Sequence, residues 1–552
     1  MTGPLMSHRP KQSFILPVRE TDPTMSRKSG APVQPTRKAI ALSALSLLLL
    51  AGCSIKPEPM TEGEQAYRAY LVRSALFQDQ EPITGPISVH EAVARGLRYN
   101  LDRRLALMEQ ALQERQLDLT KVDLLPRLAA NAGYTLRNNV SASSSFSILS
   151  GRQSLEPSTS TEREGITADL TFSWNLLDFG LSYYQAKQQA DRVLVTAERK
   201  RRVVNNIVQE IRSAFWQAAT AERLLPAIDP LIRDAEQALE RSRAIERDRV
   251  GTPVEQLEYQ KSLLEVLRTL RALRTDVVTS KARLASLMNI APGTEFSLAL
   301  PPDQELEPKR IDSELRQLEM LALVNRPELR EEDYQMRIGM AEVDKARLRY
   351  FPSFNLVAGG YWDGNRFLVN NFWADAGVRM SYNLVGLLSA PTGKRLAEAQ
   401  IEVARTRQLA LSVAIITQVN IAHAQYAQAM ENYRQAVELD DIEKRILRQV
   451  ANAEAADAQG SLDRIRRKVQ SVGAELQRGR ALAEMQTAYA NVFTSLGVDP
   501  LPETVEGASI HDLSDALKAV AERWGRGELP SMPEATPPED LDKFPHVTAK
   551  AP

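Results

Sequence analysis

Residues 166–176 read ITADLTFSWNL, and this stretch decides how the rest of the chain is interpreted. Apolar or small residues fill every second position, namely Ile166, Ala168, Leu170, Phe172 and Trp174. Polar residues fill the positions between them, namely Thr167, Asp169, Thr171, Ser173 and Asn175. A period of two is typical of a β-strand with one apolar face and one polar face. Because the surrounding sequence has a helical pattern, these strands need an explanation of their own.

The composition excludes several classes of protein. The 552 residues contain 69 Lys and Arg against 70 Asp and Glu, so no basic field is available for nucleic acid. No run of about 18 apolar residues occurs, which excludes a polytopic helical membrane protein. Cys53 is the single cysteine, and the five histidines are far apart in the sequence. No catalytic motif is present, so we expect no enzyme activity, no metal site and no cofactor.

The N-terminal region predicts the destination of the protein. Arg37 and Lys38 precede the apolar stretch AIALSALSLLLLAGC (39–53), a pattern typical of a secretory signal whose true start is Met25. The residues around Cys53 resemble the lipobox of bacterial lipoproteins, in which the cysteine is lipidated, for example with palmitate. Ser54 follows the cysteine, and the absence of Asp there favours the outer membrane. The alternative is an ordinary signal peptide with a chance cysteine.

The sequence repeats itself. LLPRLAANAGYTL (124–136) matches YFPSFNLVAGGYW (350–362), and SWNL (173–176) matches SYNL (381–384). ARLASLMNI (282–290) matches NVFTSLGVD (491–499) further along. The order of helix, two strands and a long helix pair is therefore predicted to occur twice. The expected division is 1–52 signal region, 53–86 lipid-anchored linker, 87–299 first repeat, 300–312 linker, 313–499 second repeat, and 500–552 equatorial segment with a disordered Pro-rich tail.

The predicted strands suit a membrane better than a soluble core. Each is about ten residues long, which is enough to cross a bilayer at a tilt, and aromatic residues cluster near the strand ends. Four strands cannot close a membrane-spanning barrel, and lipid tolerates no open sheet edge. Several chains must therefore contribute strands, and three chains would supply twelve. The alternative is a small soluble sheet packed on a core.

The remaining sequence predicts long helices. One runs from about Leu181 to Arg249, and Pro226 and Pro230 are expected to bend it. Three more are predicted at Val254–Met288, Lys394–Ala458 and Ser461–Leu496. A narrow packing seam recurs at three- and four-residue spacing, at Leu263, Leu267, Leu270, Leu273 and Val277. Such pairs are typical of coiled-coil hairpins.

These features together resemble the outer-membrane factors, the TolC-like exit ducts of tripartite exporters. The residues that carry the resemblance are the lipobox, the two Pro–strand–strand–helix copies, LLDFG (176–180) and Val250-Gly251-Thr252, which resembles the helix-tip motif of the family. The resemblance implies an α+β membrane protein: a trimeric twelve-stranded outer-membrane β-barrel, four strands per chain, continued by a periplasmic α-helical barrel. It also implies a periplasmic adaptor and an inner-membrane pump as partners.

The resemblance also assigns candidate sites. The family closes its tunnel with acidic side chains beyond the hairpin turns, and Glu255, Glu258 and Asp463 are the nearest matches, with Arg466 beside them. An ordinary solvated helix face is the alternative. Val250, Gly251 and Thr252 are candidates for adaptor docking, and Cys53 for lipidation. The barrel lumen would be lined by Thr167, Asp169, Thr171, Ser173, Asp375 and Arg379.

The function implied is an outer-membrane exit duct that passively conducts substrate handed over by the pump and adaptor. The alternatives are the channel of a type I protein or polysaccharide secretion system, a passive pore without a pump, and a structural coiled-coil lipoprotein. The exported substrate does not follow from the sequence, since the pump usually selects it.

Overall fold

The computed structural model describes residues 57–154, 156–248, 253–301, 306–307, 309–311, 313–454, 461–499, 507–530 and 532, without the side chains of 451–454 and 461–464. The chain divides into two units, Met1–Leu76 and Phe77–Pro552. In the first unit, α2 (Glu62–Ala75) begins with a capping box between Thr61 and Glu64. The second unit contains all the other described helices and strands.

In the second unit the same order of elements occurs twice. The first copy consists of α3 (Val89–Tyr99), α4 (Leu101–Val122), β1 (Arg127–Leu136), β4 (Glu164–Asn175), α5 (Leu176–Glu222), α6 (Leu225–Arg247) and α7 (Pro253–Leu287). The second consists of α8 (Leu315–Asn325), α9 (Pro327–Leu348), β5 (Ser353–Asp363), β6 (Phe372–Ser381), α10 (Leu384–Glu454) and α11 (Ser461–Ser495). Helix α12 (Ile510–Gly525) follows them. Two short paired strands, β2 (Ala142–Ser143) and β3 (Ser158–Thr159), lie in the loop that connects β1 to β4.

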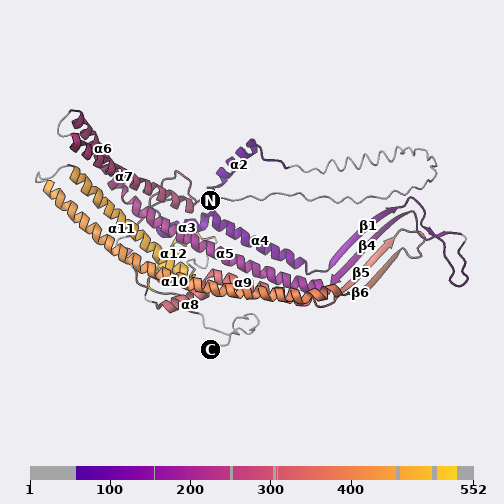
Figure 1. Cartoon of the computed structure of the whole chain (residues 1–552). Coiled ribbons are helices and arrows are strands. Elements are labelled where there is room, and N and C mark those ends of the chain that lie inside the picture. The colour runs from indigo at the N-terminus through magenta and orange to yellow at the C-terminus, as the bar shows by residue number, and fades with distance from the viewer. Residues whose placement is uncertain are drawn as a thin grey trace, which may run out of the picture. The chain divides into compact units, whose positions relative to one another are not determined.

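The four long strands and the four helices attached to them have the same order. The sheet is antiparallel throughout, in the order β1-β4-β5-β6. Helix α4 packs on α5, α5 on α9, and α9 on α10, so the helices repeat the order of the strands that they lead into or follow (Figure 1). The result is a layer of four helices that continues as a sheet of four strands.

Local sequence signals end and begin the helices at the junction between the helix layer and the sheet. Pro126 and Pro352 each stand directly before a strand, where the missing N–H and the restricted preceding residue end the helix. Asn175 ends β4, and its side chain accepts hydrogen bonds from the backbone N–H groups of Leu177 and Asp178 in α5. Asn383 caps α10 in the same way, because its side chain accepts from the Gly386 N–H at 2.8 Å. The repeated tetrapeptides SWNL (173–176) and SYNL (381–384) thus mark the place where a strand ends and the asparagine caps a helix.

The main hydrophobic core lies among the helices. Phe215 and Ile211 of α5 are fully buried against residues of α3, α7, α10, α11 and α12. The predicted seam of α7 is confirmed: Leu263, Leu267, Leu270 and Val277 are buried, and Leu273 is half-buried. Leu263, Leu267, Leu270 and Leu273 pack on α6 and on α11. The described helices include none that is long and apolar enough to cross a bilayer.

Two predicted helices have different bounds in the structure. The prediction of a single bent helix over Leu181–Arg249 is wrong. Helix α5 ends before Arg223, and α6 begins after Leu224 with Pro226 in its first turn. A missing N–H costs nothing in a first turn, so the proline favours a new helix over a bend. The predicted start at Lys394 is also wrong, since α10 begins at Leu384 and contains Pro391.

Candidate functional site

The polar residues predicted to line a channel share one face of the sheet. Thr167, Asp169, Thr171 and Ser173 alternate along β4, and the register pairs Thr171 with Gly359 and Gly359 with Asp375. Asn175, Asn355 and Arg379 form a second cross-strand row. Directly paired residues of antiparallel strands have their side chains on the same face. The structure therefore brings all six predicted residues together on that face.

The opposite face is apolar in every row except the one at the loop end, where Glu164 pairs with Leu136. Leu170 lies between Ala130 and Gly360, and Phe172 lies between Leu128 and Ala358. No described part of the chain covers this face, and Leu170 is 51% exposed. Aromatic side chains lie towards both strand ends, with Trp174 and Phe354 near the helices and Tyr134, Trp362 and Phe372 near the loops. An uncovered apolar band between aromatic belts is typical of a strand surface in contact with lipid.

Two further residues on the polar face were not predicted. Asn131 of β1 donates a hydrogen bond to Asp169 at 2.8 Å. Tyr361 of β5 folds back over Gly359, where an added Cβ would lie 2.7 Å from the phenolic oxygen and would displace the ring. The Tyr361 ring also stacks on Trp373, with 5.6 Å between centroids, which explains why Trp373 breaks the apolar pattern of β6. The alternation of residues 353–362 contains the signal for Tyr361, since it assigns the odd positions to the polar face.

The sheet and the helix layer both end in open edges on the same two sides. Strands β1 and β6 have one neighbour each among the long strands, and every residue of both is exposed. An unpaired strand edge presents free N–H and C=O groups to any further strand.

Helix α4 is the edge helix beside β1, and its outer face is apolar. Its inner face contains Ala106 and Gln113, and Gln113 accepts a hydrogen bond from Gln189 of α5 at 2.9 Å. A stripe of exposed apolar residues with heptad spacing runs along the opposite side, at Leu101, Leu105, Met108, Leu112, Leu119 and Val122. We call these residues the α4 stripe.

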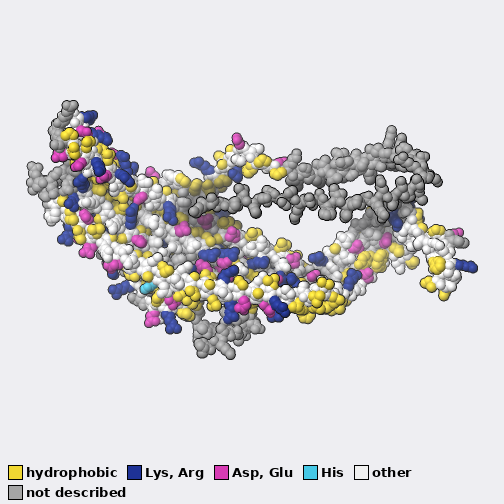
Figure 2. All heavy atoms as spheres, in the orientation of Figure 1, with side chains coloured by type: hydrophobic (Ala, Val, Ile, Leu, Met, Phe, Trp, Pro, Cys, Tyr) yellow, Lys and Arg dark blue, Asp and Glu magenta, His cyan; other side chains and the backbone are white. Residues whose placement is uncertain are grey.

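Helix α10, beside β6, has a matching exposed stripe. Gln408 on its inner face donates a hydrogen bond to Asp333 of α9. Exposed apolar residues lie on the opposite side, at Val385, Leu388, Leu396, Val403, Val413 and Ile421, and we call them the α10 stripe. Figure 2 shows hydrophobic side chains gathered where α10 begins, next to the strands. Two uncovered apolar helix faces at the two edges of one layer indicate that each edge has a partner.

The helix tips contain part of the predicted gate. Glu255 and Glu258 are exposed on the first turns of α7, and neither forms an ion pair within the described part of the chain. Arg466 of α11 donates a hydrogen bond to the Ser262 hydroxyl of α7 at 2.5 Å, which ties the two hairpins together near their tips. The side chain of Asp463, the docking residues Val250, Gly251 and Thr252, and Cys53 lie outside the described residues. The roles of all these residues stay predictions.

Polar contacts align the α6–α7 hairpin just behind its turn. Ser242 donates to Gln256 at 3.1 Å, and Gln260 donates to Glu246 at 2.7 Å. Apolar residues of α6 and α7 meet Ile465 of α11 in the next turns, so the two hairpins share one small core. The tips are therefore held by contacts between three helices.

Comparison with known proteins identifies the fold. No family model matches the chain. It is 23% identical over 338 residues to the probable outer membrane lipoprotein SilC of Salmonella typhimurium, covering 58% of this chain and 67% of SilC. It is 25% identical over 290 residues to protein CyaE of Bordetella pertussis, covering 51% of this chain and 60% of CyaE. The structure superposes on the Campylobacter jejuni CmeC outer membrane channel with a TM-score of 0.59 at 11% identity, over 80% of this chain and 94% of CmeC.

The chain has the fold of the TolC-like outer-membrane channels. Other solved outer-membrane channels superpose with TM-scores of 0.55 to 0.58. The predicted resemblance is thus confirmed for the fold, since these superpositions cover 74% to 81% of this chain.

Proposed function

We propose that this chain is the outer-membrane exit duct of a tripartite export system, and that it conducts substrate passively. Three chains would form a twelve-stranded barrel continued by a helical tube in the periplasm. The polar strand face would line the lumen, and the apolar face would contact lipid. The duct contributes no catalysis, so a pump in the inner membrane would supply the energy and a periplasmic adaptor would connect the two. The similarity to SilC and to CmeC supports this proposal.

The observation that carries the proposal is the coincidence of open edges in the two layers. One side of the chain presents β1 and the α4 stripe, and the other presents β6 and the α10 stripe. A second copy placed against the first would pair β6 with β1 and cover one stripe with the other. Such head-to-tail contacts use two different surfaces, and they end without free edges only when they close into a ring.

The roles of the predicted sites follow from this arrangement. Around a threefold axis, Glu255, Glu258 and Asp463 would repeat as an acidic ring at the tips, with Arg466 moderating its charge. Val250, Gly251 and Thr252 would contact the adaptor. Lipidated Cys53 would add an anchor in the outer membrane. The two repeats at 87–299 and 313–499 would each supply one half of every subunit.

The test is a cross-linked pull-down of the tagged protein from cells in mild detergent, with mass spectrometry of the partners. Recovery of an adaptor and an inner-membrane pump supports the duct. Glu258→Lys should reduce their recovery or the export that they drive. Glu109→Lys, at an exposed position of α4, should change neither. Recovery of a trimer alone, unaffected by Glu258→Lys, would favour a passive pore. Recovery of a monomer without partners would refute the barrel.

A further inference from the structure

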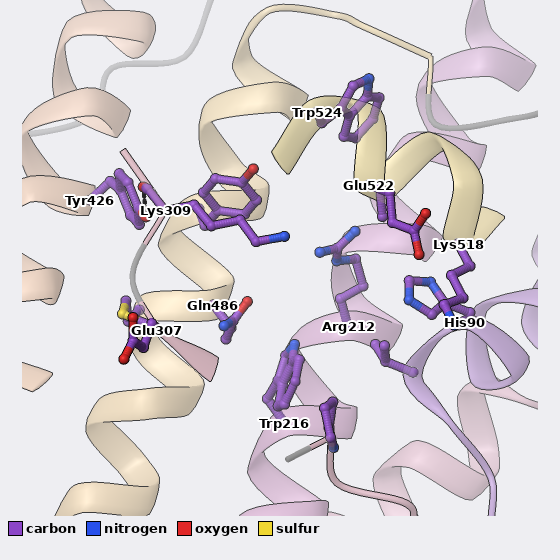
Figure 3. A pocket seen from close by; sticks show the side chains of 15 residues that line it. His90, Arg212, Trp216, Glu307, Lys309, Tyr426, Gln486, Lys518, Glu522 and Trp524 are labelled. Carbon is purple, nitrogen blue, oxygen red and sulfur yellow. Dashed lines mark hydrogen bonds between the residues drawn. The ribbon is translucent and has the colours of Figure 1, made fainter. Parts of the chain in front are cut away.

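A pocket of about 550 Å³ lies among the helices of the main core (Figure 3). Its walls come from α3, α5, α10, α11 and α12, and from Pro301, Glu307 and Lys309, which precede α8. The polar side chains that Figure 3 labels around it come from segments distant in sequence, including His90, Arg212 and Lys518. The proposed duct needs no cavity here.

The pocket contains cations that lack acidic partners. The guanidinium Nε of Arg212 is buried and has no hydrogen-bond partner among the described residues. Arg212, Lys309 and Lys518 form no ion pair within the described part of the chain, although Glu307 and Glu522 also line the pocket. Lys309 lies against Gly525 at the C-terminal end of α12, a position that favours a cation. An arginine keeps its charge even when burial lowers its pKa, as it does here.

The histidine in the pocket adds no charge at neutral pH. Burial and the positive charges of Arg212, Lys518 and Lys309 lower the pKa of His90 to about 4. The neutral imidazole can therefore donate or accept a hydrogen bond. The fixed positive charge of the pocket comes from Arg212 and the two lysines.

A second unpartnered donor and an aromatic wall complete the pocket. Trp216 is 4% exposed, and its indole N–H has no acceptor among the described residues. Tyr426 packs on Tyr489, Tyr489 on Phe493, and Phe493 stacks on Trp524 with 4.7 Å between centroids. Three of these four rings line the pocket, and their mutual packing holds the wall in place. A buried donor without an acceptor is costly, and a ligand oxygen would satisfy it.

We propose that this pocket binds a small organic anion, with a carboxylate or phosphate joined to an apolar or aromatic body. The anionic oxygens would accept charge-assisted hydrogen bonds from Arg212 and Lys518. The Trp216 N–H would donate to the same group or to a neighbouring oxygen, and the body would lie on the aromatic wall. Glu522 beside the cations would limit the charge that the pocket accepts, which favours one anionic group over several. This proposal does not depend on the function as a duct.

The experiment is a fluorine NMR titration of the full-length protein in nonionic detergent. The probes are 4-(trifluoromethyl)benzoate and its neutral counterpart 4-(trifluoromethyl)benzamide. We expect the benzoate to bind at least about tenfold more tightly, because only it pairs with the cations. Lys518→Met and Arg212→Met should each abolish most of this difference and leave the weak binding of the benzamide unchanged.

Matched controls use basic neighbours that do not line the pocket. Arg523→Met on α12 and Arg310→Met beside Lys309 should bind the benzoate like the wild type. Competition with inorganic phosphate then separates the two sources: displacement of the benzoate assigns phosphates to the site, and lack of displacement assigns carboxylates. Equal affinity for the two probes would overturn the proposal. So would Lys518→Met with wild-type affinity, since exposed Lys518 can be replaced without disturbing the core.

Discussion

The strand region and the helical core use the same kinds of residue in opposite ways. Phe215 in the core is fully buried among side chains of the same chain, whereas Leu170 in the sheet is 51% exposed on an uncovered face. No buried hydrophobic residue of the main core comes from the four long strands. The hydrophobic side chains of the core are therefore buried within one chain, whereas the described part of the chain leaves the apolar face of the sheet exposed. In the proposed duct, lipid and neighbouring copies would cover these surfaces.

The largest expected effect is a loss of stability on mutation of the helical core. Phe215→Ala removes a fully buried ring and leaves a cavity, which should cost about 3–5 kcal/mol of stability. Thermal unfolding of the purified protein in nonionic detergent, followed by circular dichroism, measures the loss. Phe372→Ala in the sheet is the matched control, because that ring is 68% exposed within the chain. Equal losses in the two variants would contradict the contrast between the regions.

The next largest effect is expected on the apolar face of the sheet. Leu170→Arg puts a charge on the apolar strand face and should cost about 2–4 kcal/mol near the middle of the bilayer. Thr171→Arg, one residue along on the polar face, should cost little because it would meet water and Asp375 in the same row. The fraction of folded protein after insertion into lipid vesicles distinguishes them. If Leu170→Arg inserts as well as Thr171→Arg, the lipid-facing assignment is wrong.

A third prediction concerns charge inside the helix layer. Burial raises the pKa of Asp333 to about 6, against the opposing hydrogen bond from Gln408 and the charge of Arg330. A raised carboxyl pKa means that the folded state binds the proton more tightly, so stability falls as the pH rises from about 4 through 6. Asp333→Asn keeps an acceptor for Gln408 and should stabilise the protein at pH 7.5 by at most about 3 kcal/mol.

The pH itself is the control for that substitution. Near pH 4 the wild-type carboxyl is protonated in the folded protein, so the melting temperatures of wild type and variant should converge. A gain for Asp333→Asn that is the same at both pH values would show that ionisation of Asp333 has no part in it.

The smallest effect tests whether the α4 stripe, at one open edge, contacts a neighbouring copy. Leu112→Arg in the α4 stripe should weaken contact with the next copy by about 1–2 kcal/mol, because the side chain is half exposed before assembly. The chain itself should keep its fold, since Leu112 faces away from α5. Cross-linking at low protein concentration measures the trimer fraction. Glu114→Arg, exposed outside the stripe, should leave that fraction unchanged, and an equal loss there would remove the stripe from the interface.

Much of the fold could be predicted because its signals are short-range. The alternation of 166–175 identified β4 and its faces, and the heptad spacing of Leu263 to Val277 identified the seam of α7. The matched SWNL and SYNL segments identified the repeat, and the structure adds that Asn175 and Asn383 in them are helix caps. The prolines were less reliable signals, because Pro391 is tolerated inside α10, whereas Pro226 coincides with a new helix.

By itself, the sequence determined the strands, their two faces, the repeat and the helix seams, since each depends on residues within a few turns of one another. Only the tertiary structure decided which strands are neighbours. Ser353 hydrogen-bonds Asn175 although 178 residues separate them, and periodicity contains no information about such pairing. The stacking of Tyr361 on Trp373 and the pocket around Arg212 were decided in the same way. Side chains from distant segments meet there because helices and strands pack, and no local pattern records where they meet.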